Sequence, residues 1–466
     1  MDKVNSAREA VGRLSELYDA SCSLARRSLQ TSDYAAYAGV RYPKLIIDVL
    51  EWQPIDRTEP FGYVNEAGRY SATLSRPAMM RSYLTSQIER LTSNYPCEIS
   101  VGYSETPIPP EYIDDAGDIS EARRAGADAH AVPRPTLDEV DDAIIDGDWD
   151  AFHGPEFPLF HFGPQRFDIA CQRIKHYTGI DADSVQKYIL FTNYAMHTTE
   201  FVKFGLQQLS DDDSRYTALN LPTGETLTSS VSVDSLTLGS SFQMPRYDLV
   251  TADGDGITMI NIGVGPSNAK TITDALAVLR PEAWIMIGHC AGLDGRMRIG
   301  DLILGNAYQR YDHVLDSNLP HNLPIPAVPE IQRALESSVN ALYGEDKSLM
   351  RTGTVISTDD RNWEWNTTKG LWEWLRGSTA AAVDMESCTL AANGYRYRVP
   401  YGTLLSVSDL PLHAVPKLPT QAQAFYSSSK QAHVMCAVHA MEQLAKAPER
   451  LRTRKLRRAI GEVPFR

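Results

Sequence analysis

Apolar side chains in the first hundred residues follow two different spacings. Helical spacing over residues 6–30 predicts an amphipathic helix, and short apolar runs predict strands at residues 43–52 and 97–101. Residues 61–63 and 70–74 flank a glycine-containing turn, which is a pattern typical of a β-hairpin. The combination predicts a small α+β domain at the start of the chain.

From about residue 165, short apolar runs alternate with segments of helical spacing. The runs that predict buried strands are residues 188–191, 257–262, 284–287, 301–307, 353–357, 380–384 and 401–408. A turn and a helix separate the second run from the third, and such a unit is expected to be a parallel right-handed crossover. The pattern therefore predicts an α/β domain in this part of the chain.

The segment between these two parts, residues 105–158, has a different composition. Prolines stand at 107, 109, 110, 133 and 135, and acidic residues accumulate around them. Because acidic, proline-bearing segments rarely bury a core, we interpret this one as a solvated connector with some helix rather than an active element. The domains are expected to be residues 1–164, with the connector, and residues 165–466.

Composition and charge narrow the possible functions. The 466 residues allow two or three domains. A net charge of −14 argues against general binding to nucleic acid, although a small anion needs only a few local donors.

The six cysteines form no Cys-x-x-Cys pair and are expected to be reduced. There is neither an apolar signal core nor an apolar run of roughly 20 residues, so we expect a cytoplasmic protein that does not bind membranes.

A glycine-rich turn, Gly263-Val264-Gly265-Pro266-Ser267-Asn268, follows one of the predicted strands. It is not a Walker A loop, since Lys270 does not follow a glycine, and Asn268 replaces the third glycine of a dinucleotide fingerprint. Two interpretations stay open. The segment is either an ordinary strand-to-helix turn or a turn whose free N–H groups bind a ribose or phosphate oxygen.

Two carboxylates stand at the ends of predicted strands in the α/β part. Glu386 follows residues 380–384, and Asp409 follows Ser408 at the end of the last predicted strand. Taken singly, Glu386 is explained as a helix-start residue favoured by the helix dipole, and Asp409 as a cap or turn residue. Ligands of open α/β sheets, however, bind outside the carboxyl ends of strands. There one carboxylate can hold sugar hydroxyls, with Met385 against the sugar face, while the other moves a proton. The pair indicates an enzyme that cleaves nucleosides or nucleotides.

His289 is a further candidate, in a strand expected to break into small residues at Gly288-His289-Cys290-Ala291-Gly292. It could contact a phosphate or a base, but a lone histidine is more often structural. Five other histidines have no ligand spacing with a nearby cysteine: His313, His321, His413, His433 and His439. The sequence therefore predicts neither a metal site nor a cofactor.

Several of these motifs combine into a family resemblance. Residues 263–267, 384–387 and 408–409 resemble the nucleoside phosphorylase/nucleosidase superfamily. Three longer stretches are similar to the AMP nucleosidase family within it: residues 261–271, 358–364 and 394–405. Residues 68–77 and 81–84 resemble the N-terminal domain of that family. The resemblance extends over nearly the whole chain.

The resemblance implies a phosphorylase-type three-layer α/β catalytic domain with a mixed sheet, preceded by a smaller α+β regulatory domain. It also implies a homohexamer that hydrolyses AMP to adenine and ribose 5-phosphate, with ATP as activator and phosphate as inhibitor. By the same resemblance, Asp409 donates a proton to adenine N7 and Glu386 holds the ribose hydroxyls. The residues expected to bind the substrate are Gly263, Gly265, His289, Arg361, Met385 and Ser408.

The nucleophile is a separate question. Phosphorolytic relatives usually carry an arginine just after the first strand of the α/β domain and another basic residue before the Gly-Ser turn. In this chain the corresponding positions are residues 191–196 and 286–289, and neither segment has a cation at the expected point. This favours water over phosphate as the nucleophile. The candidate contacts to the 5′-phosphate are Arg361, His289 and Lys417. Two alternatives remain: a purine nucleoside phosphorylase or nucleosidase for unphosphorylated nucleosides, and a nucleotide sensor that has lost catalysis.

Overall fold

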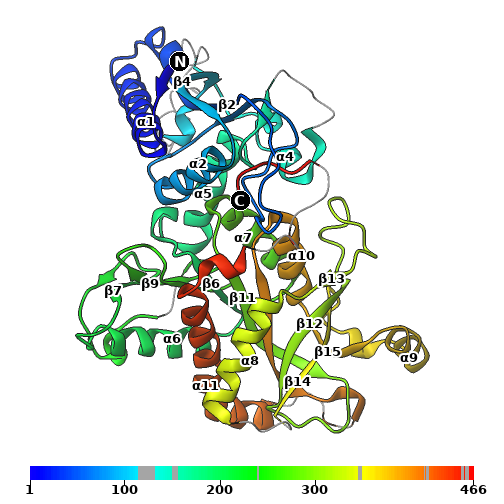
Figure 1. The fold of residues 1–466 in the computed structure, drawn as a ribbon. Coiled ribbons are helices and arrows are strands. Elements are labelled where there is room, and N and C mark those ends of the chain that lie inside the picture. Colours follow the sequence, from blue (N-terminus) through cyan, green and yellow to red (C-terminus); the bar gives the residue numbers. More distant parts are fainter. Residues whose placement is uncertain are drawn as a thin grey trace. The chain divides into compact units, whose positions relative to one another are not determined.

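The computed structural model describes residues 1–113, 132–149, 156–238, 241–344, 349–413, 415, 419–452, 456 and 461–466 (Figure 1). The chain forms two compact units. The first comprises Met1–Arg173, Val278–Arg280 and Thr453–Arg466, and the second comprises Ile174–Ala277 and Pro281–Arg452. Much of the predicted acidic connector, residues 114–131 and 150–155, lies outside the described residues, as does Lys417.

The first unit is an α+β structure, as the sequence predicts. Its elements are β1 (Asp2–Val4), α1 (Ala7–Gln30), β2 (Arg41–Val49), β3 (Gly68–Thr73), α2 (Arg81–Asn94), β4 (Cys97–Pro107), α4 (Ala143–Asp146) and β5 (Phe157–Pro158). The sheet order is β1-β4-β2-β3-β5, antiparallel except for the parallel pair β3–β5. The hydroxyl of Ser6 caps α1 by accepting a hydrogen bond from the backbone N–H of Glu9 at 3.2 Å.

The predicted β-hairpin between residues 61–63 and 70–74 is wrong. Residues 70–73 do lie in a strand, β3, but it pairs with β2, with Leu45 opposite Ala72. Residues 61–63 form no strand, and Phe61 is buried in a loop. Alternating apolar residues indicate a strand but do not identify its partner, and the long β2 offers more backbone and more buried neighbours than the short segment nearby.

The second unit is an α/β structure around one mixed sheet. Its strands are β6 (Tyr188–Thr192), β7 (Tyr216–Asn220), β8 (Thr226–Leu227), β9 (Arg246–Thr251), β10 (Ile257–Asn261), β11 (Ala283–Gly292), β12 (Leu302–Tyr311), β13 (Ile325–Pro326), β14 (Met350–Thr358), β15 (Ala380–Asp384) and β16 (Tyr401–Asp409). Its helices are α6 (Ala195–Gln208), α7 (Pro266–Leu276), α8 (Pro329–Tyr343), α9 (Thr368–Arg376), α10 (Ser387–Tyr397) and α11 (Pro419–Ala445). Helix α5 (Pro164–Thr178) continues from the first unit into the second. All seven predicted strands are present.

Part of this sheet closes on itself. The main strand order is β13-β12-β14-β15-β11-β6-β10-β9-β7-β8, and β16 pairs with both β11 and β12. The strands β12, β14, β15, β11 and β16 therefore form a closed ring, and β11 joins this ring to the open part of the sheet. Helices α6, α8 and α11 pack together as one group, and α7 and α10 as another (Figure 1).

Strand β11 differs from its prediction in two ways. It is parallel to β10, as expected, but β6 lies between the two strands. It also continues through the small residues 288–292 instead of breaking there, because Ala291 and Gly292 pair with β15. A Cβ atom on Gly292 would lie 2.7 Å from Leu410 Cδ2, so glycine permits close packing inside the strand.

Among the described residues, no helix is long and apolar enough to cross a membrane.

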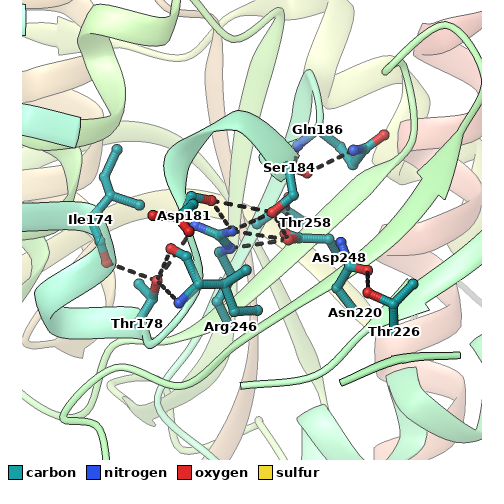
Figure 2. A network of polar contacts seen from close by, with 11 residues as sticks. Ile174, Thr178, Asp181, Ser184, Gln186, Asn220, Thr226, Arg246, Asp248 and Thr258 are labelled. Atoms are coloured by element: carbon teal, nitrogen blue, oxygen red, sulfur yellow. Dashed lines mark hydrogen bonds and ion pairs between the residues drawn. The ribbon is translucent and has the colours of Figure 1, made fainter. Parts of the chain in front are cut away.

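A buried ion pair between Arg246 and Asp248 holds strand β9 against its neighbours (Figure 2). Both side chains are 0% exposed. The guanidinium donates to Asp248 Oδ2 at 3.1 Å, and to Asp181 O and Ser184 Oγ at 2.6 Å each. Thr258 Oγ1 donates to the other carboxylate oxygen of Asp248 at 2.6 Å. Nearly every polar atom of the pair is thus used within the protein.

Replacing Asp248 by Asn is expected to destabilise the protein by about 3–5 kcal/mol, because it leaves the buried Arg246 charge without a counter-ion. The shift in the urea midpoint measures this. Glu373→Gln is the matched control, since the Lys369–Glu373 pair is exposed and should change the midpoint little. Equal shifts in the two variants would contradict the role assigned to the buried pair.

Candidate active site

Glu386 occupies the turn between β15 and α10 and is 2% exposed. It stands at the N-cap position but makes no capping hydrogen bond. That bond comes from Asp384, whose Oδ2 accepts the backbone N–H of Ser387 at 3.0 Å. The Glu386 carboxylate is therefore not needed to begin the helix and is available for another role.

Two other segments of the chain donate hydrogen bonds to Glu386. The N–H of Gly265 donates to Oε1 at 2.6 Å, and Asn193 Nδ2 donates to Oε2 at 3.3 Å. Gly265 has φ of 111°, a conformation that other residues rarely adopt, so glycine is what lets this N–H point at the carboxylate. The glycine turn, the end of β6 and the end of β15 meet at this one side chain.

The electrostatics of this carboxylate are unusual. Burial, and next the charge of Asp384, raise the pKa of Glu386 above that of an ordinary carboxyl group. Burial also raises the pKa of Asp384, while hydrogen bonds from Ser357 and Ser387 oppose the shift. Among the described residues, neither carboxylate forms an ion pair with a Lys, Arg or His side chain. In the described part of the chain, no protein cation therefore offsets the charge of either carboxyl group when it ionises.

Asp409 ends β16 and is 3% exposed. The hydroxyl of Ser408 hydrogen-bonds to its carboxylate and also lies 3.2 Å from Cys290 O. In the sheet, Ala291 of β11 has Asp409 on one side and Val383 of β15 on the other. Two strands that run in opposite directions thus end beside the same residue, and this brings the turn with Glu386 and the carboxylate of Asp409 to one end of β11.

Of the other predicted residues, Met385 and Ser408 lie next to the two carboxylates, whereas Arg361 lies apart from them. Met385 is partly exposed next to Glu386, and Ser408 contacts Asp409. The N–H of Gly263 donates to Asn261 Oδ1 at 3.1 Å, so the N–H groups of both glycines in the turn already have acceptors. Arg361 is exposed beyond the end of β14, and no described hydrogen bond or ion pair links it to the other predicted residues.

His289 is buried in β11, and its ring centroid lies 4.3 Å from that of Tyr194. Asn193 was not predicted from the sequence as a partner of Glu386. A signal for it existed, because Asn193 directly follows β6, whose carboxyl end lies beside that of β10 and the glycine turn.

Two families match the chain. Residues 9–156 match the family described as Bacterial AMP nucleoside phosphorylase N-terminus, and residues 232–444 match the Phosphorylase superfamily. The AMP nucleosidase of Escherichia coli (strain K12) is 44% identical over 420 residues, which are 88% of this chain and 86% of that protein. The chain belongs to the AMP nucleosidase family. The family resemblance predicted from the sequence is confirmed.

More distant proteins resemble parts of this member of the AMP nucleosidase family. The 5′-methylthioadenosine/S-adenosylhomocysteine nucleosidase of Desulfotalea psychrophila (strain LSv54 / DSM 12343) is 22% identical over 204 residues, or 43% of this chain and 85% of that protein. The crystal structure of AMP nucleosidase from Bacteroides thetaiotaomicron VPI-5482 is similar with a TM-score of 0.44 and 26% identity, covering 60% of this chain and 97% of that one. The AMP nucleosidase assignment itself rests on the Escherichia coli relative, which covers most of the chain.

Proposed function

We propose that the protein hydrolyses the N-glycosidic bond of AMP, giving adenine and ribose 5-phosphate. The observation that supports this most is the buried Glu386 carboxylate, which has no cationic partner among the described residues. In its ionised form this group stabilises the positive charge that develops on ribose as the base departs, and that positive charge in turn favours the ionised form. Membership of the AMP nucleosidase family supports AMP as the substrate.

In this mechanism, Asp409 protonates N7 of adenine, so that the base departs as a neutral molecule. Ser408 orients the Asp409 carboxyl group through its hydroxyl. Glu386 accepts hydrogen bonds from the ribose hydroxyls. Each carboxylate oxygen can accept two hydrogen bonds, so the contacts from Gly265 and Asn193 leave acceptor capacity for the sugar. Met385, partly exposed beside Glu386, packs against the ribose.

Water is the nucleophile in this proposal. Residues 191–196 and 286–289 contain no Lys or Arg, and a phosphate nucleophile would need such a charge beside the sugar. His289 and Arg361 stay candidate contacts to the 5′-phosphate. Activation by ATP, inhibition by phosphate, a regulatory role for the first unit, a homohexamer and a cytoplasmic location are part of the same proposal and rest on the family resemblance.

The products decide between hydrolysis and phosphorolysis. The purified full-length protein is incubated with AMP and ATP, with and without phosphate, and the products are separated by chromatography. We expect adenine and ribose 5-phosphate in the absence of phosphate. Adenine that forms only with phosphate, alongside a sugar 1-phosphate, would contradict hydrolysis by water.

A parallel reaction with adenosine tests the alternative substrate class. We expect AMP to be cleaved with the higher kcat/KM, and a preference for adenosine would favour a nucleoside-cleaving enzyme. Binding of AMP without any cleavage would favour the nucleotide sensor.

A further inference from the structure

Three histidines from distant parts of the chain meet beside the candidate active site. His197 lies in α6, His289 in β11 and His433 in α11, and all three are buried. The ring centroids are 5.2 Å apart for His197–His433, 5.5 Å for His197–His289 and 6.3 Å for His289–His433. One ring nitrogen from each residue lies within 4.8 Å of the other two.

Hydrogen bonds orient two of these rings. His433 Nε2 donates to Leu404 O at 2.8 Å, which leaves Nδ1 as the second nitrogen of that ring. His197 Nδ1 lies 2.8 Å from Thr192 Oγ1, and its buried Nε2 has no hydrogen-bond partner among the described residues. An imidazole held on one side by a carbonyl or hydroxyl, with its other nitrogen turned inward, is the usual arrangement of a histidine ligand to a metal.

The surroundings of the rings suit the same role. All three side chains are buried, and burial favours the neutral imidazole, whose lone pair is what a metal ion needs.

The geometry points to a binding site for a divalent transition metal of the zinc class, held by His197, His289 and His433. Zinc–nitrogen bonds of about 2.0–2.1 Å in a tetrahedral arrangement place imidazole centroids about 5 Å apart. Two of the three separations, 5.2 and 5.5 Å, lie near that distance, and the His289–His433 pair at 6.3 Å would have to close by about 1 Å around an ion. An all-imidazole set favours zinc, copper, nickel or iron over magnesium and calcium, which prefer oxygen ligands.

This site lies close to the proposed active site and shares His289 with the candidate phosphate contacts, but ion binding can be measured without the reaction. Thr192, Asn193 and Tyr194 are consecutive, and they contact His197, Glu386 and His289 respectively. Three protein ligands also leave one tetrahedral position for water. The three residues are far apart in the sequence and come together only in the folded sheet and helices, so the sequence alone does not indicate this metal site.

Metal binding is measured directly on the full-length protein. The protein is stripped with a chelator, dialysed against Zn²⁺ and analysed for metal per chain, and Co²⁺ is titrated in parallel to give the visible spectrum of a tetrahedral site. We expect one ion per chain. His197→Gln or His433→Gln should lower the Zn²⁺ affinity by about 100-fold or more, because each removes a ligand.

Two further variants make the result specific. His433→Cys keeps a zinc ligand and should retain the ion, with a thiolate-to-cobalt absorption band that the unmodified protein lacks. His439→Gln, on the same helix and half-buried, should change nothing. The proposal is overturned if the unmodified protein binds no Zn²⁺ or Co²⁺, or if binding survives the His197 and His433 substitutions. Loss of the ion in His313→Ala would also overturn it, because it would place the metal at the exposed His313, Asp316 and His321.

AMP cleavage plays no part in these measurements. Failure of the metal site therefore leaves the proposed function standing, and an inactive protein that binds zinc leaves the metal site standing.

Discussion

Asp409→Asn is expected to lower kcat for AMP by about 10²–10⁴-fold, the range typical of a lost general acid. The amide has nearly the shape of the carboxyl group and can still accept a hydrogen bond from Ser408, so the fold should be kept. The amide cannot deliver a proton to adenine N7, and the base would have to leave as an anion. Steady-state rates of adenine release at saturating AMP measure the effect, and circular dichroism checks the fold.

Two comparisons make the Asp409 result interpretable. Asp301→Asn changes another buried aspartate of the same unit, whose carboxylate accepts the N–H of Arg298 at 2.9 Å, and should leave kcat nearly unchanged. A substrate with a better leaving base should also recover much of the rate in Asp409→Asn, because it needs less protonation. Near-normal turnover of AMP by Asp409→Asn would remove Asp409 from the mechanism.

Glu386→Gln is expected to have opposite effects on activity and stability. We expect kcat/KM to fall by about 10²–10³-fold, because a neutral amide does not stabilise the cationic sugar. The folded state raises the pKa of Glu386, so it holds this proton more tightly than the unfolded state does. Stability is therefore lost as the pH rises from the ordinary carboxyl pKa toward the raised one. Glutamine carries no charge, so the variant should be more stable than the unmodified protein at pH 8. At pH 5 this gain in stability should be smaller or absent.

Urea unfolding at the two pH values tests this prediction. The gain at pH 8 should exceed the gain at pH 5 by about 1 kcal/mol or more, since one pKa unit is worth 1.36 kcal/mol. Rotation of the Asn193 amide gives the new Gln side chain an acceptor, because Asn193 Oδ1 has no other partner among the described residues. The control is Glu200→Gln, which removes a buried carboxylate that is paired with Lys203 and Lys430 and should not stabilise the protein. A gain that is equal at both pH values would refute the buried-charge explanation.

Local patterns in the sequence predicted the elements well but not their partners. The seven apolar runs of the α/β part are all strands, because a short run of buried side chains between turns usually forms a buried strand. Strand β3 was also recognised, but its pairing with β2 instead of residues 61–63 depends on backbone far away in the chain. The continuation of β11 through Gly288–Gly292 likewise depends on β15, which begins about 90 residues later. The local sequence pattern around β11 therefore does not show this pairing.

The candidate site shows the same division. Glu386 and Asp409 were found because each ends an apolar run, and the structure brings their strand ends together beside Ala291. The glycine turn was recognised, but the acceptor of the Gly265 N–H was not, since a side-chain carboxylate more than a hundred residues away fills that role. Asn193 and the grouping of His289 with His197 and His433 were missed for a related reason: both depend on neighbours that only the fold supplies.

The closed ring of strands also has a consequence for biosynthesis. Trp284 of β11 pairs with Tyr401 of β16, and the ring is incomplete until β16 has joined both β11 and β12. The ribosome synthesises the chain from its N-terminus, so the edges of β11 and β12 that pair with β16 stay unpaired until β16 has left the exit tunnel. Such edges are where chains aggregate. A nascent chain stalled before residue 401 would therefore be a substrate for chaperones, and the turn with Glu386 would exist in it without Asp409.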